Sequence, residues 1–266
     1  MATNNDIYTQ LNELEISFPN EKSKKFGLNQ FSSFLSDKKF LPKSDVIAKD
    51  FKNDLDGETI NKKNEKLSTT SVNSKYGYDT QFKDIYSGND TKPNEFGSDP
   101  YSTFNNKYMF LGLNQAYRSD NKLNGWLNFH DKEAGKHSAQ MLRLRLVLND
   151  LDYYGCYITD IFKNFVNSNS KDVINSEQGN KDSEEFKNSA KILAEEISIV
   201  NLKQIVIFGS DAFNAFTEMA NMNFFKDNQT AVKNAIQTTH YSSQSDQAYT
   251  EWFNVKRPEL SEKLSK

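Results

Sequence analysis

Cysteine is almost absent from this chain of 266 residues, since Cys156 is the only one. A single cysteine excludes a disulfide within the chain and any cluster held by several thiolates, and it is typical of a reducing compartment. Long apolar runs are also missing: no stretch approaches the ~18 residues of a membrane-spanning helix. The first residues lack the basic-then-apolar pattern of a signal peptide. We therefore expect a cytoplasmic protein without a membrane partner.

A strong charge of one sign is absent as well. The chain has 33 Lys and Arg against 36 Asp and Glu, for a net charge of -3. No global field therefore attracts nucleic acid, although a local basic patch would still serve. Apolar residues make up 36%, below the usual ~45–50%, but 20 Phe and 12 Tyr each bury large areas. The length suits one large domain or one domain with an appendage.

Several motifs of common enzyme classes are missing. The sequence contains no phosphate-binding GxxxxGK[ST], no GxGxxG after its first expected strand and no GxSxG. These absences exclude a P-loop nucleotide hydrolase, a dinucleotide-dependent dehydrogenase and a serine hydrolase of the usual kind. His130 and His137 fall in a loop-like stretch at a spacing that does not indicate a metal site. We expect neither a metal nor a cofactor.

The first hundred residues differ in composition from the rest. They are rich in Lys, Asn, Asp and Ser, and their apolar residues are scattered. Residues 6–14 and 26–35 are expected to form short amphipathic helices, whereas residues 61–73 and 87–100 show no periodicity. We predict that residues 1–100 form a partly helical, partly irregular N-terminal extension, and that residues 101–266 form an α/β domain.

From residue 101 onward, strand-like and helix-like patterns alternate. Such alternation predicts an α/β fold of three α/β/α layers around a four-stranded parallel sheet. Strands are expected over residues 108–113, 155–161, 204–208 and 235–239. Helices are expected over residues 136–151, 183–200 (capped by Ser183), 211–222 (capped by Ser210 or Asp211) and 247–264 (interrupted near Pro258).

Polar residues stand at the end of each expected strand. They are Asn114, Asp160, the pair at 209–210 and His240. Right-handed crossovers bring the carboxyl ends of parallel strands to one edge, and ligands of α/β sheets bind outside those ends. We therefore expect Asn114 and His240 to face one cleft, although they are more than 100 residues apart.

Four motifs on these strands resemble those of a known family. They are Gly-Leu-Asn at 112–114, Tyr-Ile-Thr-Asp-Ile-Phe-Lys at 157–163, Ile-Val-Ile-Phe-Gly at 205–209 and His-Tyr-Ser at 240–242. Their order and spacing over residues 108–245 resemble the uracil-DNA glycosylase superfamily. The resemblance implies a four-stranded parallel sheet between helices, and an enzyme that flips a damaged or deaminated base out of DNA and hydrolyses its N-glycosidic bond.

The resemblance also implies roles for residues at the strand ends. Asn114 would hold a water below the sugar carbon, and His240 would donate a hydrogen bond to the base oxygen as negative charge develops there. Ser242 would lie near a DNA phosphate. Gln244 falls where the loop of the family wedges into the duplex.

We expect the base pocket to contain Gly112, Leu113, Asp160 and Phe129. Trp126 and Phe129 are both candidates to stack on a flipped base, with core packing as the alternative for at least one of them. The phosphate-gripping positive charges are expected among Arg118, Lys122, Lys132, Lys136 and Lys163.

The chain departs from the family pattern at three positions. Gln115 and Tyr241 stand where prolines are common, and Asp160 stands where several members carry an Asn that reads the base. A carboxylate only accepts hydrogen bonds, whereas an amide both donates and accepts. An ionised Asp160 would accept from uracil N3–H and repel uracil O4, so the residue favours a base that presents donors.

Simpler roles remain open for each of these residues. Asn114 and Asp160 are each also suited to capping a turn, His240 to making one backbone hydrogen bond, and the loop charges to remaining solvated. The sequence leaves two functions: a DNA glycosylase-like enzyme with DNA as its partner, or a non-catalytic module that binds nucleic acid, a nucleotide or a protein partner.

Overall fold

The structure is a computed structural model that divides into two compact units. Unit 1 consists of Met1–Ser36, Asn89–Phe129 and Tyr153–Thr238, and unit 2 of Asp37–Gly88, His130–Asp152 and Thr239–Lys266. The described residues are 4–35, 104–115, 126, 128, 129, 144, 147, 148, 150–153, 155–163, 165–241 and 252–266.

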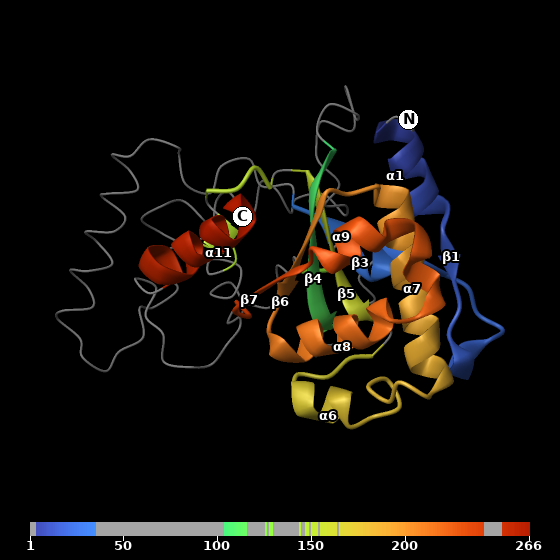
Figure 1. The fold of residues 1–266 in the computed structure, drawn as a ribbon. Helices are drawn as coiled ribbons and strands as arrows, with labels where there is room; N and C mark the ends of the chain where they lie inside the picture. The colour runs from blue at the N-terminus through green and yellow to red at the C-terminus, as the bar shows by residue number, and fades with distance from the viewer. Residues whose placement is uncertain are drawn as a thin grey trace, which may run out of the picture. The chain divides into compact units, whose positions relative to one another are not determined.

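Unit 1 is built around a five-stranded sheet with the strand order β3-β5-β4-β6-β7 (Figure 1). The four strands predicted from the sequence form its parallel part, which confirms the α/β class. An antiparallel fifth strand at the edge, next to β5, was not predicted. The bounds are β3 Ser32–Phe34, β4 Asn105–Asn114, β5 Cys156–Phe162, β6 Gln204–Phe208 and β7 Ile236–Thr238.

The three central strands are buried on both faces. Their residues from Tyr108 to Leu113, along all of β5 and from Ile205 to Phe208 are buried, as parallel strands between two layers require. Side chains alternate between the two faces. Met109, Leu111 and Leu113 belong to the main hydrophobic core, and the intervening Phe110 stacks on Phe208 on the other face (ring centroids 6.0 Å apart).

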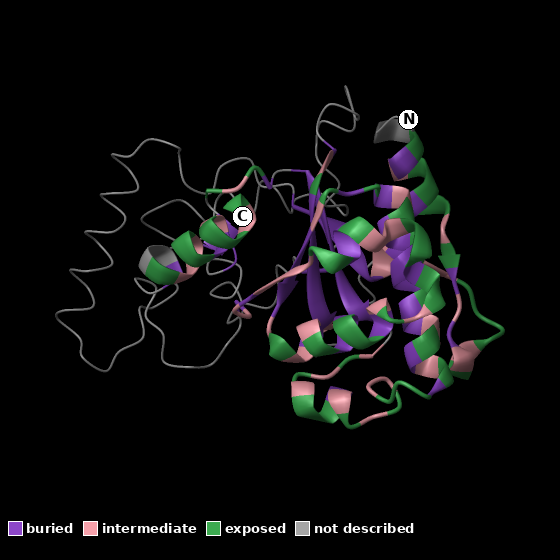
Figure 2. Ribbon diagram, viewed as in Figure 1, coloured by how far each residue is buried: buried purple, intermediate pink, exposed green. Residues whose placement is uncertain are grey.

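Two helices, α7 Glu184–Val200 and α8 Ser210–Ala220, contribute to that core. Figure 2 shows buried residues along one side of each. The predicted cap of α7 is confirmed, because Ser183 Oγ accepts from Phe186 N–H at 3.0 Å. The predicted cap of α8 is wrong. Gly209 is its N-cap, at φ 91°, a conformation that glycine adopts without strain.

The N-terminal segment also belongs to unit 1. It forms α1 Asn4–Glu13, close to the predicted helix, then β1 Glu15–Ile16 paired with β2 Phe26–Gly27. Short 3₁₀ turns lie at Pro19–Glu21 and Leu28–Gln30. The second predicted helix, residues 26–35, is wrong.

In that segment, backbone pairing with β5 replaces the helix. β3 pairs antiparallel with β5, and Leu35 N–H donates to Cys156 O at 2.9 Å. The ring of Phe34 packs against Trp126, with centroids 5.1 Å apart, and against Tyr157 at 5.5 Å. Tertiary pairing and aromatic burial thus override a weak helical pattern.

Shorter helices complete the described chain. Unit 1 adds α6 Ser170–Ile174, the 3₁₀ turn Asn223–Asn228 and α9 Gln229–Lys233. In unit 2 a π-helical turn, Trp252–Lys256, leads into α11 Arg257–Ser265. Pro258 therefore lies in the first turn of α11 and does not interrupt a helix. Proline is common at this position.

Most of the predicted helix at 136–151 lies outside the described residues. Leu144, Val147 and Leu148 are described within it, and they are helical and buried. Within the described ranges, no helix is long and apolar enough to cross a membrane.

Candidate functional site

Gly112 and Asp160 face each other near the carboxyl ends of β4 and β5. The parallel register pairs them directly, so both side-chain positions point to the same face of the sheet. A Cβ at position 112 would collide with Asp160 Oδ1 and would lie 3.3 Å from Phe129 Cε1. The structure therefore brings together three of the four residues predicted to bind a base.

Phe129 adopts a strained backbone conformation beside this pair. Its φ is 71°, a region that is costly for a bulky residue. Such outliers persist where the surroundings over-determine them, and they cluster at ligand sites. The Phe129 ring is buried yet has no aromatic partner among the described residues. Of the two aromatic side chains named from the sequence, Phe129 is the one that lies beside Gly112.

Trp126 packs in the core, which is the alternative that the sequence left open for one of the two aromatic residues. Its φ is also positive, at 66°. Its indole packs against the rings of Tyr8, Phe34 and Tyr157, with centroids 5.1–6.3 Å apart. Trp126 is therefore a core residue that holds the N-terminal segment against the sheet.

The fourth predicted residue, Leu113, lies elsewhere. Strand alternation directs its side chain to the face opposite Gly112, where it belongs to the hydrophobic core. The structure thus does not bring the Leu113 side chain to Asp160.

Asn128 is a member of the site that the sequence did not reveal. Its side-chain Nδ2 donates to Asp160 Oδ2 at 2.9 Å and to Phe31 O at 2.5 Å. Only 1% of the residue is exposed, and its Oδ1 has no hydrogen-bond partner in the described part of the chain. The only hint in the sequence was that Asn128 precedes Phe129, and this does not reveal the contacts of the Asn128 side chain. Asp160 therefore holds an amide from another loop.

Asn114 ends β4 with its amide nitrogen among three backbone carbonyls. Its Nδ2 donates to Gln115 O at 2.9 Å, Phe165 O at 3.2 Å and Asn167 O at 2.8 Å. These contacts tie the tip of β4 to the segment after β5. They also fix the amide, because a reversed side chain would place its oxygen against carbonyl oxygens. The half-buried Asn114 therefore presents Oδ1 as an acceptor in a defined direction.

His240 belongs to unit 2 and is described within that unit. It follows β7 by two residues, and its ring stacks on Tyr241, with centroids 4.7 Å apart and an interplanar angle of 20°. A half-exposed imidazole on an aromatic ring has its plane fixed by that contact. The prediction that His240 and Asn114 face one cleft stays a prediction.

Three of the predicted DNA contacts, Arg118, Ser242 and Gln244, lie outside the described residues. Lys163 is described, and its position corrects the sequence-based expectation. Its side chain is fully buried, forms an ion pair with Glu196 Oε2 at 2.5 Å and donates to Asp160 O at 2.8 Å. An ammonium without solvent exposure cannot grip a phosphate, so Lys163 has an internal, structural position.

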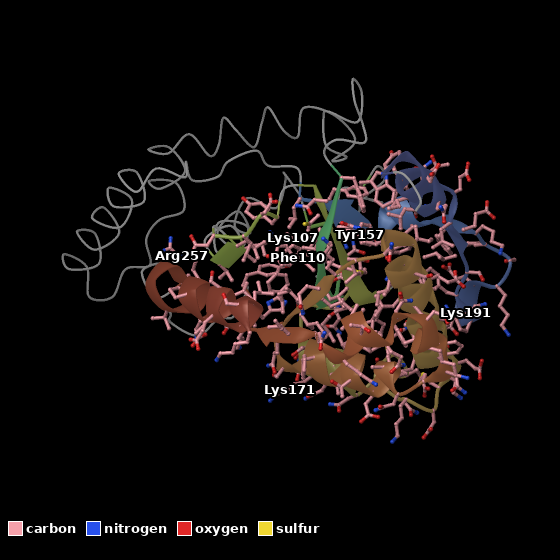
Figure 3. The ribbon with its side chains drawn as sticks, turned by 45° about the horizontal axis from the view of Figure 1, so that its top comes forward. Lys107, Phe110, Tyr157, Lys171, Lys191 and Arg257 are labelled. Atoms are coloured by element: carbon pink, nitrogen blue, oxygen red, sulfur yellow. The ribbon has the colours of Figure 1, made fainter. Side chains whose placement is uncertain are left out.

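Glu196 is the centre of a buried polar network between α7 and the sheet. Its Oε1 accepts hydrogen bonds from Tyr157 Oη at 2.7 Å, Thr159 Oγ1 at 3.1 Å and Ser32 Oγ at 3.2 Å. With Lys163 on the other oxygen, one helix carboxylate joins β3, β5 and the residues after β5. In Figure 3, Tyr157 lies within the sheet, whereas Lys171 and Lys191 extend from α6 and α7. Lys163 connects this network to the main-chain carbonyl of Asp160, so the network helps to fix the position of a candidate site residue.

The network makes stability depend on pH. Burial raises the pKa of Tyr157 well above its ordinary value of 10.0, and the charge of Glu196 raises it further. Above that pH the unfolded chain loses this proton while the folded protein keeps it, so the stabilisation is present below pH 10.0 and is lost as pH rises. We expect the free energy of unfolding to fall by up to about 1.4 kcal/mol per pH unit from this group. A Tyr157→Phe variant should show a shallower fall.

Urea unfolding between about pH 9 and about pH 11 measures both slopes. Tyr108→Phe, which removes a hydroxyl from β4 outside the network, is the matched control and should keep the wild-type slope. Identical slopes for wild type and Tyr157→Phe would mean that Tyr157 does not carry this dependence.

No group of three or more His, Cys, Asp or Glu suited to a metal ion occurs within the described ranges. The site instead combines an acceptor-rich strand end, a glycine against which Asp160 and Phe129 pack closely, and an aromatic ring. Residues 96–261 match the family described as the uracil DNA glycosylase superfamily, which is well over half of the chain. The chain therefore belongs to the uracil-DNA glycosylase superfamily, and a DNA glycosylase-like role follows in general terms. No curated protein and no solved structure matches the chain.

Proposed function

We propose that this protein is a monofunctional DNA glycosylase that takes a flipped base into a pocket formed by Gly112, Asp160, Phe129 and Asn128. The observation that carries the proposal is the meeting of Gly112, Asp160 and the strained Phe129 at the carboxyl ends of β4 and β5. A planar base needs one open face, one ring to stack on and a polar edge to read. Within unit 1, Phe129 supplies the ring, and Asp160 with Asn128 supplies the polar edge.

Asn114 is the proposed water-positioning residue. Its amide nitrogen is held by three carbonyls, so its Oδ1 accepts a hydrogen bond from a water without reorganising. A water held by a fixed acceptor can attack the sugar carbon as positive charge develops on the sugar. The same tethering also suits a purely structural Asn114, and this favours the second candidate, a non-catalytic module that binds nucleic acid in the same pocket.

His240 is the proposed leaving-group stabiliser. In this reaction negative charge develops on the departing base, and a preorganised donor there stabilises the transition state. The stacking on Tyr241 holds the imidazole plane, so the N–H direction is set before substrate binds. Tyr241 thus replaces the proline common in the family with a side chain that also restricts the histidine.

The test is a base-release assay on single- and double-stranded oligonucleotides that carry uracil, hypoxanthine, xanthine or a mismatched thymine. Release leaves an abasic site, which alkali cleaves. A glycosylase yields cleaved product from at least one substrate, whereas the binding module retains the oligonucleotides without yielding any.

Gly112→Ala tests the pocket itself. The added methyl group would push Asp160 or Phe129 aside, because it would collide with Asp160 Oδ1 and lie 3.3 Å from the Phe129 ring. Displacements of about 1 Å at a reacting centre cost ~10²-fold in rate, and overpacking costs ~1–3 kcal/mol of stability. We expect base release to fall by about this factor in a protein that still folds, as measured by thermal unfolding. Wild-type release from Gly112→Ala would place the pocket elsewhere.

A further inference from the structure

The side chain of Asn128 is buried beside Asp160 and leaves one oxygen without a partner. Its Nδ2 donates to Asp160 Oδ2 at 2.9 Å and to Phe31 O, which uses both hydrogens of the amide. Its Oδ1 accepts nothing from the described residues, although only 1% of Asn128 is exposed. Buried polar atoms in native proteins almost always have partners, and an exception requires an explanation.

The orientation of this amide is determined by its neighbours. Both contacts of Nδ2 are oxygens that can only accept, one from a carboxylate and one from a carbonyl. Turning the amide over would place Oδ1 against both of them and leave Nδ2 facing away. The open group at this position is therefore an acceptor, not a donor.

The neighbours of Asn128 indicate a ligand rather than a packing defect. Asp160, its hydrogen-bond partner, lies against Gly112, where a Cβ would collide with Asp160 Oδ1. Phe129, the next residue along the chain, has a strained φ of 71° and its ring edge reaches Gly112. An unpartnered acceptor, a carboxylate, a glycine and a ring in one cluster fit a planar molecule that brings an N–H donor.

We propose that Asn128 is a specificity-determining residue of the base pocket and that it selects nucleobases carrying an exocyclic amino group. This inference rests on the proposed function, because it names the class of base that the pocket takes. An amino group donates to Asn128 Oδ1 and is compatible with the nearby carboxylate of Asp160. A base whose edge carries carbonyl oxygens at these positions, such as uracil, leaves Oδ1 less well satisfied and brings its oxygens toward a carboxylate.

The experiment uses the full-length protein and three free pyrimidines: uracil, cytosine and isocytosine. Isocytosine differs from uracil by an amino group in place of O2, and cytosine by an amino group in place of O4. Saturation-transfer NMR titration at millimolar base gives their dissociation constants. We expect the better of the two amino-bearing bases to bind about tenfold more tightly than uracil.

Two variants assign the preference to this pair of residues. Asn128→Leu keeps the branched shape of the side chain and removes Oδ1 together with the Nδ2 donor, so the amino-bearing bases should lose their advantage over uracil. Asp160→Asn adds N–H donors to the pocket and should shift the preference toward uracil by about tenfold. Asn106→Leu is the control, since Asn106 is also a β4-associated amide that donates to a carbonyl, that of Asn201, outside the site. If Asn128→Leu does not fold, the base preference of the wild type and the shift caused by Asp160→Asn still test the inference.

The outcomes separate this inference from the function on which it rests. If uracil binds the wild type as tightly as both amino-bearing bases, or if Asn128→Leu keeps the preference, Asn128 Oδ1 holds only a water and the inference is overturned. Base release from uracil-containing DNA would leave the proposed function standing in that case. If the wild type binds no base and releases none from any oligonucleotide, the proposed function fails, and the inference fails with it.

Discussion

Glu196→Gln is expected to lower the free energy of unfolding by about 3–5 kcal/mol, since it leaves one partner of a buried ion pair uncompensated. The carboxylate is fully buried, 2.5 Å from Lys163 Nζ, and accepts from three hydroxyls through its other oxygen. Glutamine keeps the shape and part of the hydrogen bonding, but it removes the charge that holds the ammonium of Lys163. The loss should appear as a lower urea midpoint with little change of slope.

Two further variants test whether this loss of stability comes from the buried ion pair. Glu195→Gln changes the exposed neighbour on the same helix and should alter stability by less than about 0.5 kcal/mol. Lys163→Met combined with Glu196→Gln removes both charges but keeps an amide oxygen to accept from the three hydroxyls, and should recover most of the loss, because no uncompensated charge is then left buried. A Glu196→Gln protein as stable as the wild type would show that the pair does not form as the structure has it.

Asn114→Ala and His240→Ala are each expected to lower the rate of base release by about 10²–10³-fold. Asn114 loses the fixed acceptor that holds the attacking water. His240 loses the N–H that stabilises the departing base. Single-turnover kinetics on the substrate that the wild type cleaves fastest measures the chemical step directly.

Matched variants separate catalysis from folding. Asn106→Ala removes an amide that donates to Asn201 O at 3.1 Å from the opposite end of β4, and it should keep base release near the wild-type rate. His137→Ala removes a histidine to which we assign no role and should do the same. If either control matches its partner in loss of rate, the effect is one of folding, and the assigned residue leaves the mechanism.

The parallel strands were predictable because each is a short apolar run closed by a glycine or a polar residue. β6, Gln204–Phe208, is almost entirely β-branched and aromatic, and Gly209 follows it. Ser183 was predictable as the cap of α7 because a hydroxyl precedes two glutamates and a long amphipathic pattern. These signals are local, so the sequence carries them without knowledge of the fold.

The edge strand β3 was not predictable in the same way. Ser32–Phe34 has neither alternation nor an apolar run, and its conformation depends on pairing with β5, more than 100 residues later. Gly209 was missed as the cap of α8 because the neighbouring Ser210 is the better capping residue by type. The positive φ at Gly209, which decided the outcome, is a property of the chain path rather than of residue type.

Part of the candidate site followed from topology alone. The parallel register places Gly112 of β4 beside Asp160 of β5, near the carboxyl ends where ligands of such sheets bind. The predicted phosphate-binding role of Lys163 was wrong. A lysine near a polar loop is ordinarily exposed, and nothing in the local sequence indicates that Lys163 pairs with Glu196 on α7. Asn128 was missed for the same reason, since its importance comes from contacts with Phe31 and Asp160 across the fold.

The most direct test of the proposed glycosylase activity is the appearance of abasic sites in defined DNA. Wild-type protein is incubated with oligonucleotides that differ in one base, and the products are treated with alkali and separated by length. We expect cleavage at the position of at least one tested base, and at least about 10²-fold slower cleavage by Asn114→Ala. Intact oligonucleotides for every base, from a folded protein, would contradict it.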